Sequence, residues 1–333
     1  MAGLLGTGLD VRVRGPSAIK KLPTVDILQY SKRLQSITTT EEGVAATFAD
    51  GTTEGGTLLI GAEGAHSRTR DWQFQASPQV AALQTVPISS FVALTKFNRE
   101  LASSLRNIHP TYCTALNPSN VLTFFSLHDG AANDPAEWVF MILLSWPVSE
   151  TDDHAALARD DNLLLDKVCA LVEPLADPFK AMVRGIPRGT KTWYSSRMTY
   201  WPTRPWDNRG GRVTLAGDAA HALTFREFFL SACHKTKYAD EISSRVDRGQ
   251  GLGNAITDVA ELQTHLRAMK AHTRDELAKA VGEYEKEVWL RGYEVVVQNR
   301  ENTMALHDWE KVSQSALFVK GVKKDQSAPA AGE

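Results

Sequence analysis

Hydrophobic and polar residues alternate early in the chain in a way that predicts strands. Residues 44–48 follow a period of two, which is typical of a strand with one buried face. Asp50 and Gly51 come next and favour a hairpin turn. Residues 57–60 form a short apolar run, which predicts a buried strand leading directly into the glycine-containing segment 61–70.

The middle of the chain predicts a β-rich domain. An amphipathic pattern near residues 155–175 predicts a helix, and residues 151–153 supply candidate N-cap side chains. A broad sheet with one helix on it is the economical interpretation. This sheet could form the wall of a ligand cavity or be purely structural, because both predict the same pattern. The aromatic and β-branched runs that predict the sheet are residues 90–94, 121–125 and 138–146.

The last third of the chain predicts a strand followed by two helices. Residues 211–217 form a short apolar strand that ends at Asp218. After a glycine-rich stretch, residues 254–269 predict one helix and residues 274–311 a second, highly charged one. The second helix carries a core-facing apolar stripe, formed by Leu277, Val281, Tyr284, Val288 and Trp289.

Composition and charge narrow the class of protein. The 333 residues suffice for two domains, and the formal net charge of −2 gives no electrostatic reason to expect nucleic acid or an anionic membrane as partner. Cys113, Cys169 and Cys233 show no metal-type spacing and favour a reducing compartment. No secretory signal is visible, and the longest apolar run, residues 138–146, is too short to span a bilayer. We therefore expect a cytoplasmic protein without a metal site.

The first glycines, Gly3, Gly6 and Gly8, imitate a dinucleotide-binding loop. Such a loop follows a buried strand, and Met1 leaves no room for one. Their spacing is also wrong. An NAD-dependent dehydrogenase needs a glycine loop after a strand, so that alternative lacks its motif.

Two segments together carry a family resemblance. Residues 61–70, and residues 211–255 with their Gly-Asp and Gly-Gln-Gly sequences, resemble the signatures of class A FAD-dependent monooxygenases. The similarity is greatest to the salicylate-hydroxylase-like aromatic hydroxylases of fungal secondary metabolism. This resemblance implies an α/β fold: a split Rossmann-like FAD-binding domain, an inserted β-rich substrate domain and C-terminal helices.

The resemblance also implies domain boundaries. Residues 1–80 would form a partial FAD-binding domain, 81–200 the β-rich substrate domain, 201–265 the second part of the FAD-binding domain, 266–320 the C-terminal helices and 321–333 a disordered tail.

Cofactor-binding residues follow from the same resemblance. In the family the Asp of the Gly-Asp motif binds the ribityl hydroxyls of FAD, so Asp218 is expected to do so, with Gly217 allowing close approach. Gly249, Gly251 and Leu252 would pack against the flavin at the N-terminus of the following helix. The partial positive charge of that helix end can stabilise an anionic reduced flavin.

The first motif implies further contacts to the cofactor region. The family has a strand-to-helix turn here that touches both the flavin region and the nicotinamide donor, so Glu63 and Gly64 are candidates. Glu63 stands where the family usually has Asp. Arg70 could pair with Glu63 or with a phosphate, or it could be an ordinary arginine on a helix surface.

The chain departs from the family pattern in several places. The family's N-terminal strand, glycine loop and helix hold the ADP half of FAD and are absent, so we expect an N-terminally truncated chain without the first βαβ unit. Ala222 replaces the usual Pro, and Gly253 stands in the position of the usual Asn, which follows as Asn254.

An atypical insert, residues 226–246, separates two halves of the second motif that adjoin in the family. Removing it restores the motif in frame, so we hypothesise that it is translated intron sequence, and we extend the hypothesis to residues 11–29. The alternative for the insert is a regulatory lid, because long loops are sometimes functional.

The expected function is that of the family. The intact protein would bind FAD, take hydride from NADPH or NADH, and use O2 to hydroxylate or epoxidise an aromatic, polyketide-like or terpenoid small molecule. No catalytic residue can be assigned, because His109, His128, Tyr112 and Tyr194 are better explained by structural roles than by catalytic ones. The alternative is a truncated, non-catalytic flavoprotein remnant that binds flavin weakly or not at all.

Overall fold

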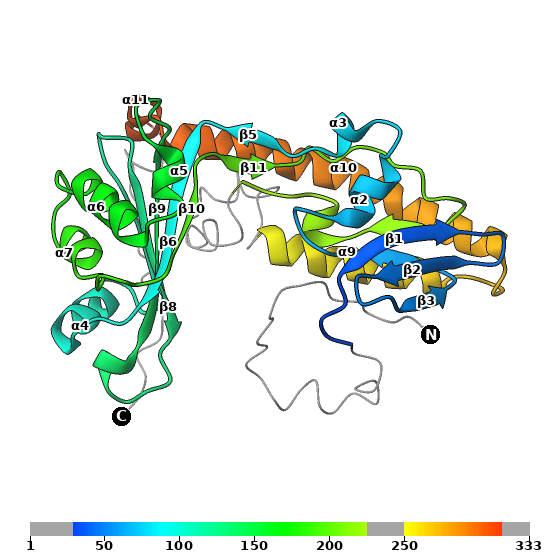
Figure 1. Ribbon diagram of the computed structural model, residues 1–333, viewed down its shortest axis with the longest axis horizontal. Helices are drawn as coiled ribbons and strands as arrows, with labels where there is room; N and C mark the ends of the chain where they lie inside the picture. The colour runs from blue at the N-terminus through cyan, green and yellow to red at the C-terminus, as the bar shows by residue number, and fades with distance from the viewer. Residues whose placement is uncertain (1–28, 225–249, 315–333) are drawn as a thin grey trace, which may run out of the picture. The chain divides into compact units, whose positions relative to one another are not determined.

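The computed structural model describes residues 29–224 and 250–314, which divide into two compact units (Figure 1). The described part of unit 1 comprises residues 29–84, 200–223 and 250–298, and the rest belongs to unit 2. The expected mixed α/β fold is confirmed, whereas the split Rossmann arrangement and its domain boundaries stay predictions. Gly249, the insert at 226–246, the tail at 321–333 and nearly all of segment 11–29 lie outside the described residues.

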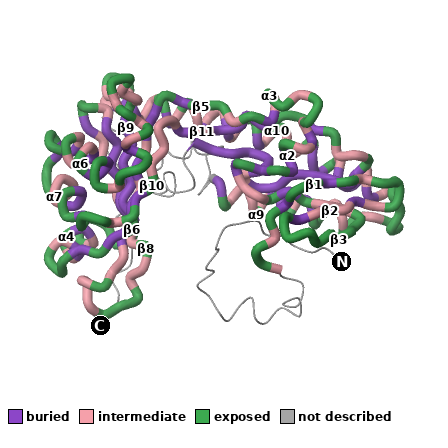
Figure 2. Tube along the Cα trace, viewed as in Figure 1, coloured by how far each residue is buried: buried purple, intermediate pink, exposed green. Residues whose placement is uncertain are grey.

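Unit 1 contains a small antiparallel sheet of β1 (Leu34–Thr39), β2 (Val44–Phe48) and β3 (Thr53–Gly56). Residues in β2 alternate between buried and half-buried, which confirms the predicted period of two. Asp50 makes the expected turn, because its carboxylate accepts hydrogen bonds from the Thr52 main-chain N–H at 3.0 Å and from Lys32 Nζ at 2.7 Å. The edge strand β3 is exposed along its whole length (Figure 2).

A second, parallel ladder lies in the same unit. β4 (Leu59–Gly61) pairs with β12 (Val213–Leu215) over three residues. The strand predicted at residues 57–60 therefore begins two residues later. β4 leads through a turn into α2 (Arg68–Gln73), as expected, and α3 (Pro78–Ala81) follows.

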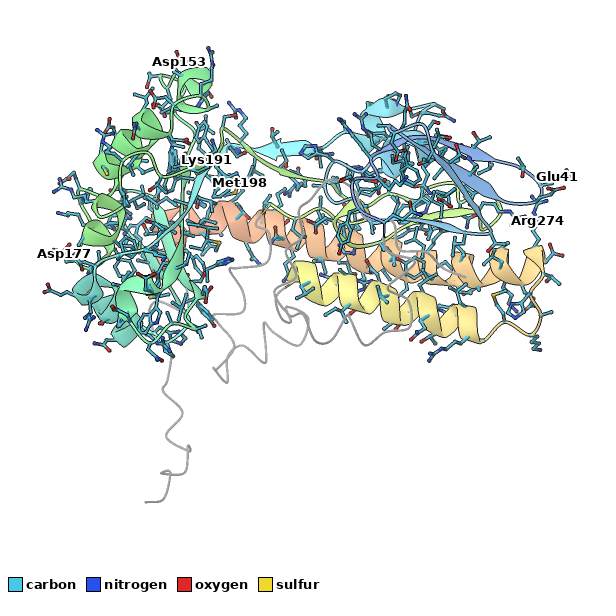
Figure 3. All side chains as sticks on the ribbon, turned by 60° about the horizontal axis from the view of Figure 1, so that its bottom comes forward. Glu41, Asp153, Asp177, Lys191, Met198 and Arg274 are labelled. Carbon is cyan, nitrogen blue, oxygen red and sulfur yellow. The ribbon has the colours of Figure 1, made fainter. Side chains whose placement is uncertain are left out.

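Two long helices run side by side in unit 1 (Figure 3). α9 (Gln250–Arg267) begins four residues before the predicted start, and α10 (Arg274–Leu306) begins where the pattern placed it. The predicted stripe on α10 is confirmed, because Val281, Tyr284 and Val288 are all fully buried.

Unit 2 is built on a five-stranded antiparallel sheet in the order β10-β6-β9-β8-β7. Each of the three predicted aromatic runs falls in one of its strands. Where the chain passes between the units, β5 (Gln84–Val86) pairs with β11 (Met198–Tyr200). The strands of the large sheet are β6 (Ile88–Thr95), β7 (Tyr112–Leu116), β8 (Leu122–Asp129), β9 (Val139–Pro147) and β10 (Thr192–Ser195).

The expectation of one helix on this sheet is wrong. Asp153 caps α5 (His154–Leu157), and Asp160 then caps a new helix, α6 (Asp161–Leu171), by accepting two main-chain N–H groups. These helices replace the single predicted one. Two further helices, α4 (Arg99–Ile108) and α7 (Phe179–Arg184), pack on the same core as α6. The short elements η2 (Pro135–Glu137) and α11 (Trp309–Ser313) complete the unit.

No helix in residues 29–224 or 250–314 is both long and apolar enough to cross a bilayer.

Candidate functional site

The carboxyl ends of β4 and β12 lie next to each other in unit 1. Beyond the paired residues, the Ala216 main-chain N–H donates to Gly61 O at 2.9 Å, so the ladder extends to the last residue before the Gly217 turn. Ligands of α/β proteins bind at the carboxyl ends of parallel strands. The two motifs that predicted a cofactor site therefore meet at the edge where such a site is expected.

The turn after β12 is η3 (Gly217–Ala219), and it packs closely on α9. Gly217 has a φ of +61°, a conformation that side chains disfavour. A Cβ atom there would lie 3.5 Å from Ala255 Cβ. Glycine thus lets the chain turn sharply where it contacts the helix.

Asp218 is the residue that this turn presents. It is the only residue from 211 to 224 that is not buried. Its carboxylate forms no hydrogen bond or ion pair with any residue in the described part of the chain. A carboxylate is a strong acceptor, so Asp218 is available to a ligand that carries hydroxyl or N–H donors.

The residues around Asp218 are held from several sides. Three neighbouring carbonyls accept hydrogen bonds within unit 1, whereas the Asp218 carboxylate has no partner among the described residues. The contacts are Tyr284 Oη to Leu215 O at 2.8 Å, Thr203 Oγ1 to Ala220 O at 2.8 Å and the Trp201 main-chain N–H to Ala222 O at 3.0 Å.

A fully buried carboxylate on α9 binds the same turn. Asp258 accepts hydrogen bonds from the Gly217 main-chain N–H at 2.6 Å and from His221 Nε2 at 2.8 Å, and it pairs with Arg291 at 2.5 Å. Burial favours a higher pKa for Asp258, but the hydrogen bonds and charges of His221 and Arg291 outweigh it and lower the pKa. Asp258 is therefore a buried anion with satisfied partners.

Glu63 has an internal role in this structure. Its carboxylate accepts hydrogen bonds from Ser67 Oγ at 2.8 Å, from the Thr69 main-chain N–H at 2.9 Å and from Thr69 Oγ1. Both oxygens are engaged, so Glu63 stabilises the first turn of α2. Gly64 has a φ of +83°, and no atom lies within 4 Å of where its Cβ would be, so this stretch of main chain is open.

Arg70 is neither on the helix surface nor hydrogen-bonded to Glu63, so both of those expectations are wrong. The residue is 2 % exposed, and its guanidinium carbon Cζ lies over the Trp201 ring, 4.8 Å from the ring centroid. Burial lowers its pKa to about 10. Its guanidinium donates to three main-chain carbonyls: Ala81 O at 3.0 Å, Ala219 O at 3.1 Å and Ala65 O.

The glycine-rich stretch differs from the expectation in one respect. Gly251 and Leu252 lie in the first turn of α9 rather than before it. Gly251 is buried, and Leu252 is 57 % exposed. Both remain near the helix end that the resemblance assigned to the flavin.

Sequence reasoning missed the anchoring residues Asp258 and Arg291. A signal for Asp258 was present: it shares one face of α9 with Gly251 and Leu262, both buried, and a carboxylate on a buried helix face needs partners. The identity of those partners could not be predicted, because Gly217 and Arg291 lie far away in sequence.

Three of the four candidate side chains of the β-rich region have structural partners, and the fourth, His128, is exposed. Tyr194 Oη lies 2.7 Å from His154 Nδ1, and His109 Nδ1 accepts main-chain N–H groups of Thr111 and Tyr112. His128 lies in β8, and Tyr112 stacks on Phe124. Among the residues that the structure describes, no cluster of His, Cys, Asp or Glu could hold a metal ion.

Comparison with known proteins identifies the family. The chain is 35 % identical over 303 residues to the FAD-dependent monooxygenase cctM of Talaromyces islandicus, which covers 90 % of this chain and 68 % of that protein. The chain belongs to the FAD-dependent monooxygenase family. FAD is the cofactor of this family, so the resemblance drawn from the two motifs is confirmed. This monooxygenase is also 33 % identical to the FAD-dependent monooxygenase phnB of Penicillium herquei, covering 88 % of this chain and 66 % of that one.

Solved structures agree on the fold. HpxO of Klebsiella pneumoniae, complexed with FAD and uric acid, matches with a TM-score of 0.62 at 22 % identity. The match covers 89 % of the present chain and 63 % of the HpxO chain. The 2,6-dihydroxypyridine-3-hydroxylase of Arthrobacter nicotinovorans matches with a TM-score of 0.62 at 17 % identity, over 83 % and 64 %. No family model matches. The monooxygenase spans about two thirds of the length of its curated relatives.

Proposed function

We propose that this chain binds FAD at the carboxyl ends of β4 and β12, with Asp218 accepting hydrogen bonds from the ribityl hydroxyls. The observation that carries the proposal is the part-exposed carboxylate of Asp218, which has no partner among the described residues and lies in an otherwise buried segment. A polyol chain supplies several O–H donors, and charge-assisted hydrogen bonds of this kind are among the strong ones.

The neighbouring residues fit the flavin end of the cofactor. Gly217 and Gly251 have no side chains to block close approach, and the main chain at Gly64 is open. The first turn of α9, with Gly251 and Leu252, would contribute N–H groups and partial positive charge toward an anionic reduced flavin. Glu63 and Arg70 act indirectly, since their polar atoms hold α2 and the turn in place.

The proposed reaction is a monooxygenation. Bound FAD would take two electrons from NADPH or NADH and activate O2. One oxygen atom enters an aromatic, polyketide-like or terpenoid substrate and the other leaves as water, with NAD(P)H and one proton consumed for each product formed. The residues described here bind and orient the cofactor in this scheme, and none is assigned to proton transfer.

FAD binding tests the site directly. Purified protein is titrated with FAD while flavin fluorescence and absorbance are followed, for the unaltered chain and for Asp218→Ala. We expect the variant to bind FAD at least about tenfold more weakly, which corresponds to about 1.4 kcal/mol. Asp207→Asn is the matched control, because Asp207 is an exposed carboxylate in the same segment whose one ion-pair partner among the described residues is Arg209.

The outcomes separate the two functional hypotheses. Saturable FAD uptake that Asp218→Ala weakens and Asp207→Asn leaves unchanged supports the site. A colourless protein that takes up no FAD favours the non-catalytic remnant. Activity is a separate measurement: NAD(P)H oxidation should rise with candidate phenols, and ¹⁸O2 should label the product.

A further inference from the structure

Asp258 bridges the two sides of the turn that presents Asp218. One carboxylate oxygen, Oδ2, accepts both the Gly217 main-chain N–H and His221 Nε2. Gly217 directly precedes Asp218, and His221 follows three residues later. A single oxygen on α9 therefore fixes the entry and the exit of the turn.

The second oxygen of Asp258 connects this turn to α10. Oδ1 accepts Arg291 Nη2, and Arg291 also donates to Asn254 Oδ1 at 2.8 Å and to Glu287. Arg291 is 20 % exposed, whereas the side chains of Asp258 and His221 are both 0 % exposed. The network thus runs from the surface of α10 to the buried side of the turn.

His221 supports the same arrangement. Its Nε2 lies 2.8 Å from Asp258 Oδ2, and its Nδ1 has no hydrogen-bond partner among the described residues. Within the described part of the chain the imidazole bonds only to Asp258, so its hydrogen-bonding contribution to the fold passes through that carboxylate.

We propose that Asp258 is a positioning residue for FAD: it sets the main chain at Gly217 and thereby the direction of the Asp218 carboxylate. This inference rests on the proposed function. Asp258 is fully buried and touches no ligand itself, and it acts through the turn. A buried anion with three directional donors holds geometry more tightly than apolar packing does, because the Gly217 N–H and His221 Nε2 lose their acceptor if the carboxylate moves.

Asp258→Asn is the informative substitution because it keeps the size of the side chain. The amide oxygen can replace Oδ2 toward Gly217 and His221, but the amide NH2 then faces the guanidinium of Arg291, which has only donors. The connection to α10 is lost while the volume is preserved. Arg291→Met removes the same connection from the partly exposed side and keeps both Oδ2 contacts of Asp258.

Glu285→Gln is the matched control. Glu285 is also a fully buried carboxylate in unit 1, with three hydrogen-bond donors, but none of them belongs to residues 217–221. Each substitution turns one carboxylate oxygen into an NH2 group that faces a donor, Arg291 in one case and Asn208 in the other, so both unfolding temperatures should fall. Only Asp258→Asn should weaken FAD binding, by about tenfold or more relative to Glu285→Gln.

A second measurement follows the turn without any cofactor. Hydrogen exchange of a peptide that begins at Gly217 and ends at Thr224, and so excludes the Glu285 partner Thr214, is compared by mass spectrometry in the FAD-free proteins. We expect faster exchange there in Asp258→Asn and Arg291→Met, and no change in Glu285→Gln. A general loss of stability would instead raise exchange throughout unit 1 in all three variants.

The failures are distinguishable. Asp258→Asn protein that binds FAD as tightly as Glu285→Gln protein overturns the positioning role and leaves the flavin site standing. Unchanged exchange at residues 217–224 in Asp258→Asn has the same consequence. If Asp258→Asn does not fold, unaltered FAD affinity in Arg291→Met overturns the role equally. Unaltered protein that takes up no FAD overturns the proposed function, and the positioning role with it.

Discussion

Glu285 Oε1 accepts a hydrogen bond from Thr214 Oγ1 at 2.8 Å, which fastens α10 to the middle of β12. The same carboxylate accepts Trp206 Nε1 at 2.8 Å and Asn208 Nδ2 at 2.7 Å. All three donors are neutral, and Glu285 forms no ion pair with any described cation. Burial therefore dominates and raises the pKa of Glu285 to about 7.

This raised pKa predicts a pH-dependent stability. The folded protein holds the Glu285 proton more tightly than the unfolded chain does, so this group stabilises the fold as the pH falls from 7 toward 4.5 and loses that contribution above 7. A shift of this size corresponds to about 3 kcal/mol at most. Urea titrations at pH 5 and pH 8 measure the free energy of unfolding. The contribution of Glu285 to it should be larger at pH 5 than at pH 8.

Glu285→Gln isolates the contribution of this group from those of other residues. The variant cannot ionise here, so its stability relative to the unaltered protein should improve by about 2 kcal/mol between pH 5 and pH 8. Asp258, whose pKa is lowered, acts in the opposite direction but is common to both proteins and cancels. A constant difference between the two proteins across this range would show that Glu285 ionises normally.

Arg70→Lys should destabilise unit 1 despite keeping the charge. The planar guanidinium reaches three carbonyls in different segments, and a lysine ammonium cannot reach all three or stack in the same way on Trp201. Unpaired buried carbonyls predict a loss of about 2–4 kcal/mol. Denaturant unfolding measures it, with Arg68→Lys, an exposed position on the same helix, as the control. A loss equal to that of the control would contradict the structural role of Arg70.

Local features of the fold were predictable from sequence. The Asp50 and Gly51 turn and the buried stripe on α10 depend on contacts within a few residues, and both were placed correctly. The helix predicted over residues 155–175 failed for a local reason as well. Asp160 fits a surface position in a helix and an N-cap equally well, and only its bonds to the next helix decide between them.

The candidate site was predictable only in part. The resemblance marked Gly217 and Asp218, and the parallel pairing of β4 with β12 brings them to the expected edge. The roles of Arg70 and Asp258 depend on partners far away in sequence, since Arg70 bonds Ala219 across 149 residues. A pattern of residue types contains no such pairing, so the anchoring of the site could not be derived from it.

Tyr284→Phe should weaken the end of β12 without opening a cavity. The Tyr284 hydroxyl is buried and donates to Leu215 O at 2.8 Å, and burial raises the pKa of this phenol. Removing the hydroxyl leaves the carbonyl unpaired, at a cost of about 1–3 kcal/mol. Tyr293→Phe, on the same helix but 42 % exposed, is the control and should change the free energy of unfolding by less than about 0.5 kcal/mol. Equal effects of the two substitutions would argue against the bond to Leu215.

Gly51→Ala should destabilise the hairpin between β2 and β3 through the backbone alone. Gly51 has a φ of +84°, and no atom lies within 4 Å of its would-be Cβ, so conformational strain is the only cost expected. That cost is about 1 kcal/mol. Gly55→Ala is the control, because Gly55 lies in exposed β3 with equal space around it and an ordinary φ. The unfolding temperatures of both variants are measured. Equal unfolding temperatures for Gly51→Ala and Gly55→Ala would mean that the turn does not hold its left-handed conformation in solution.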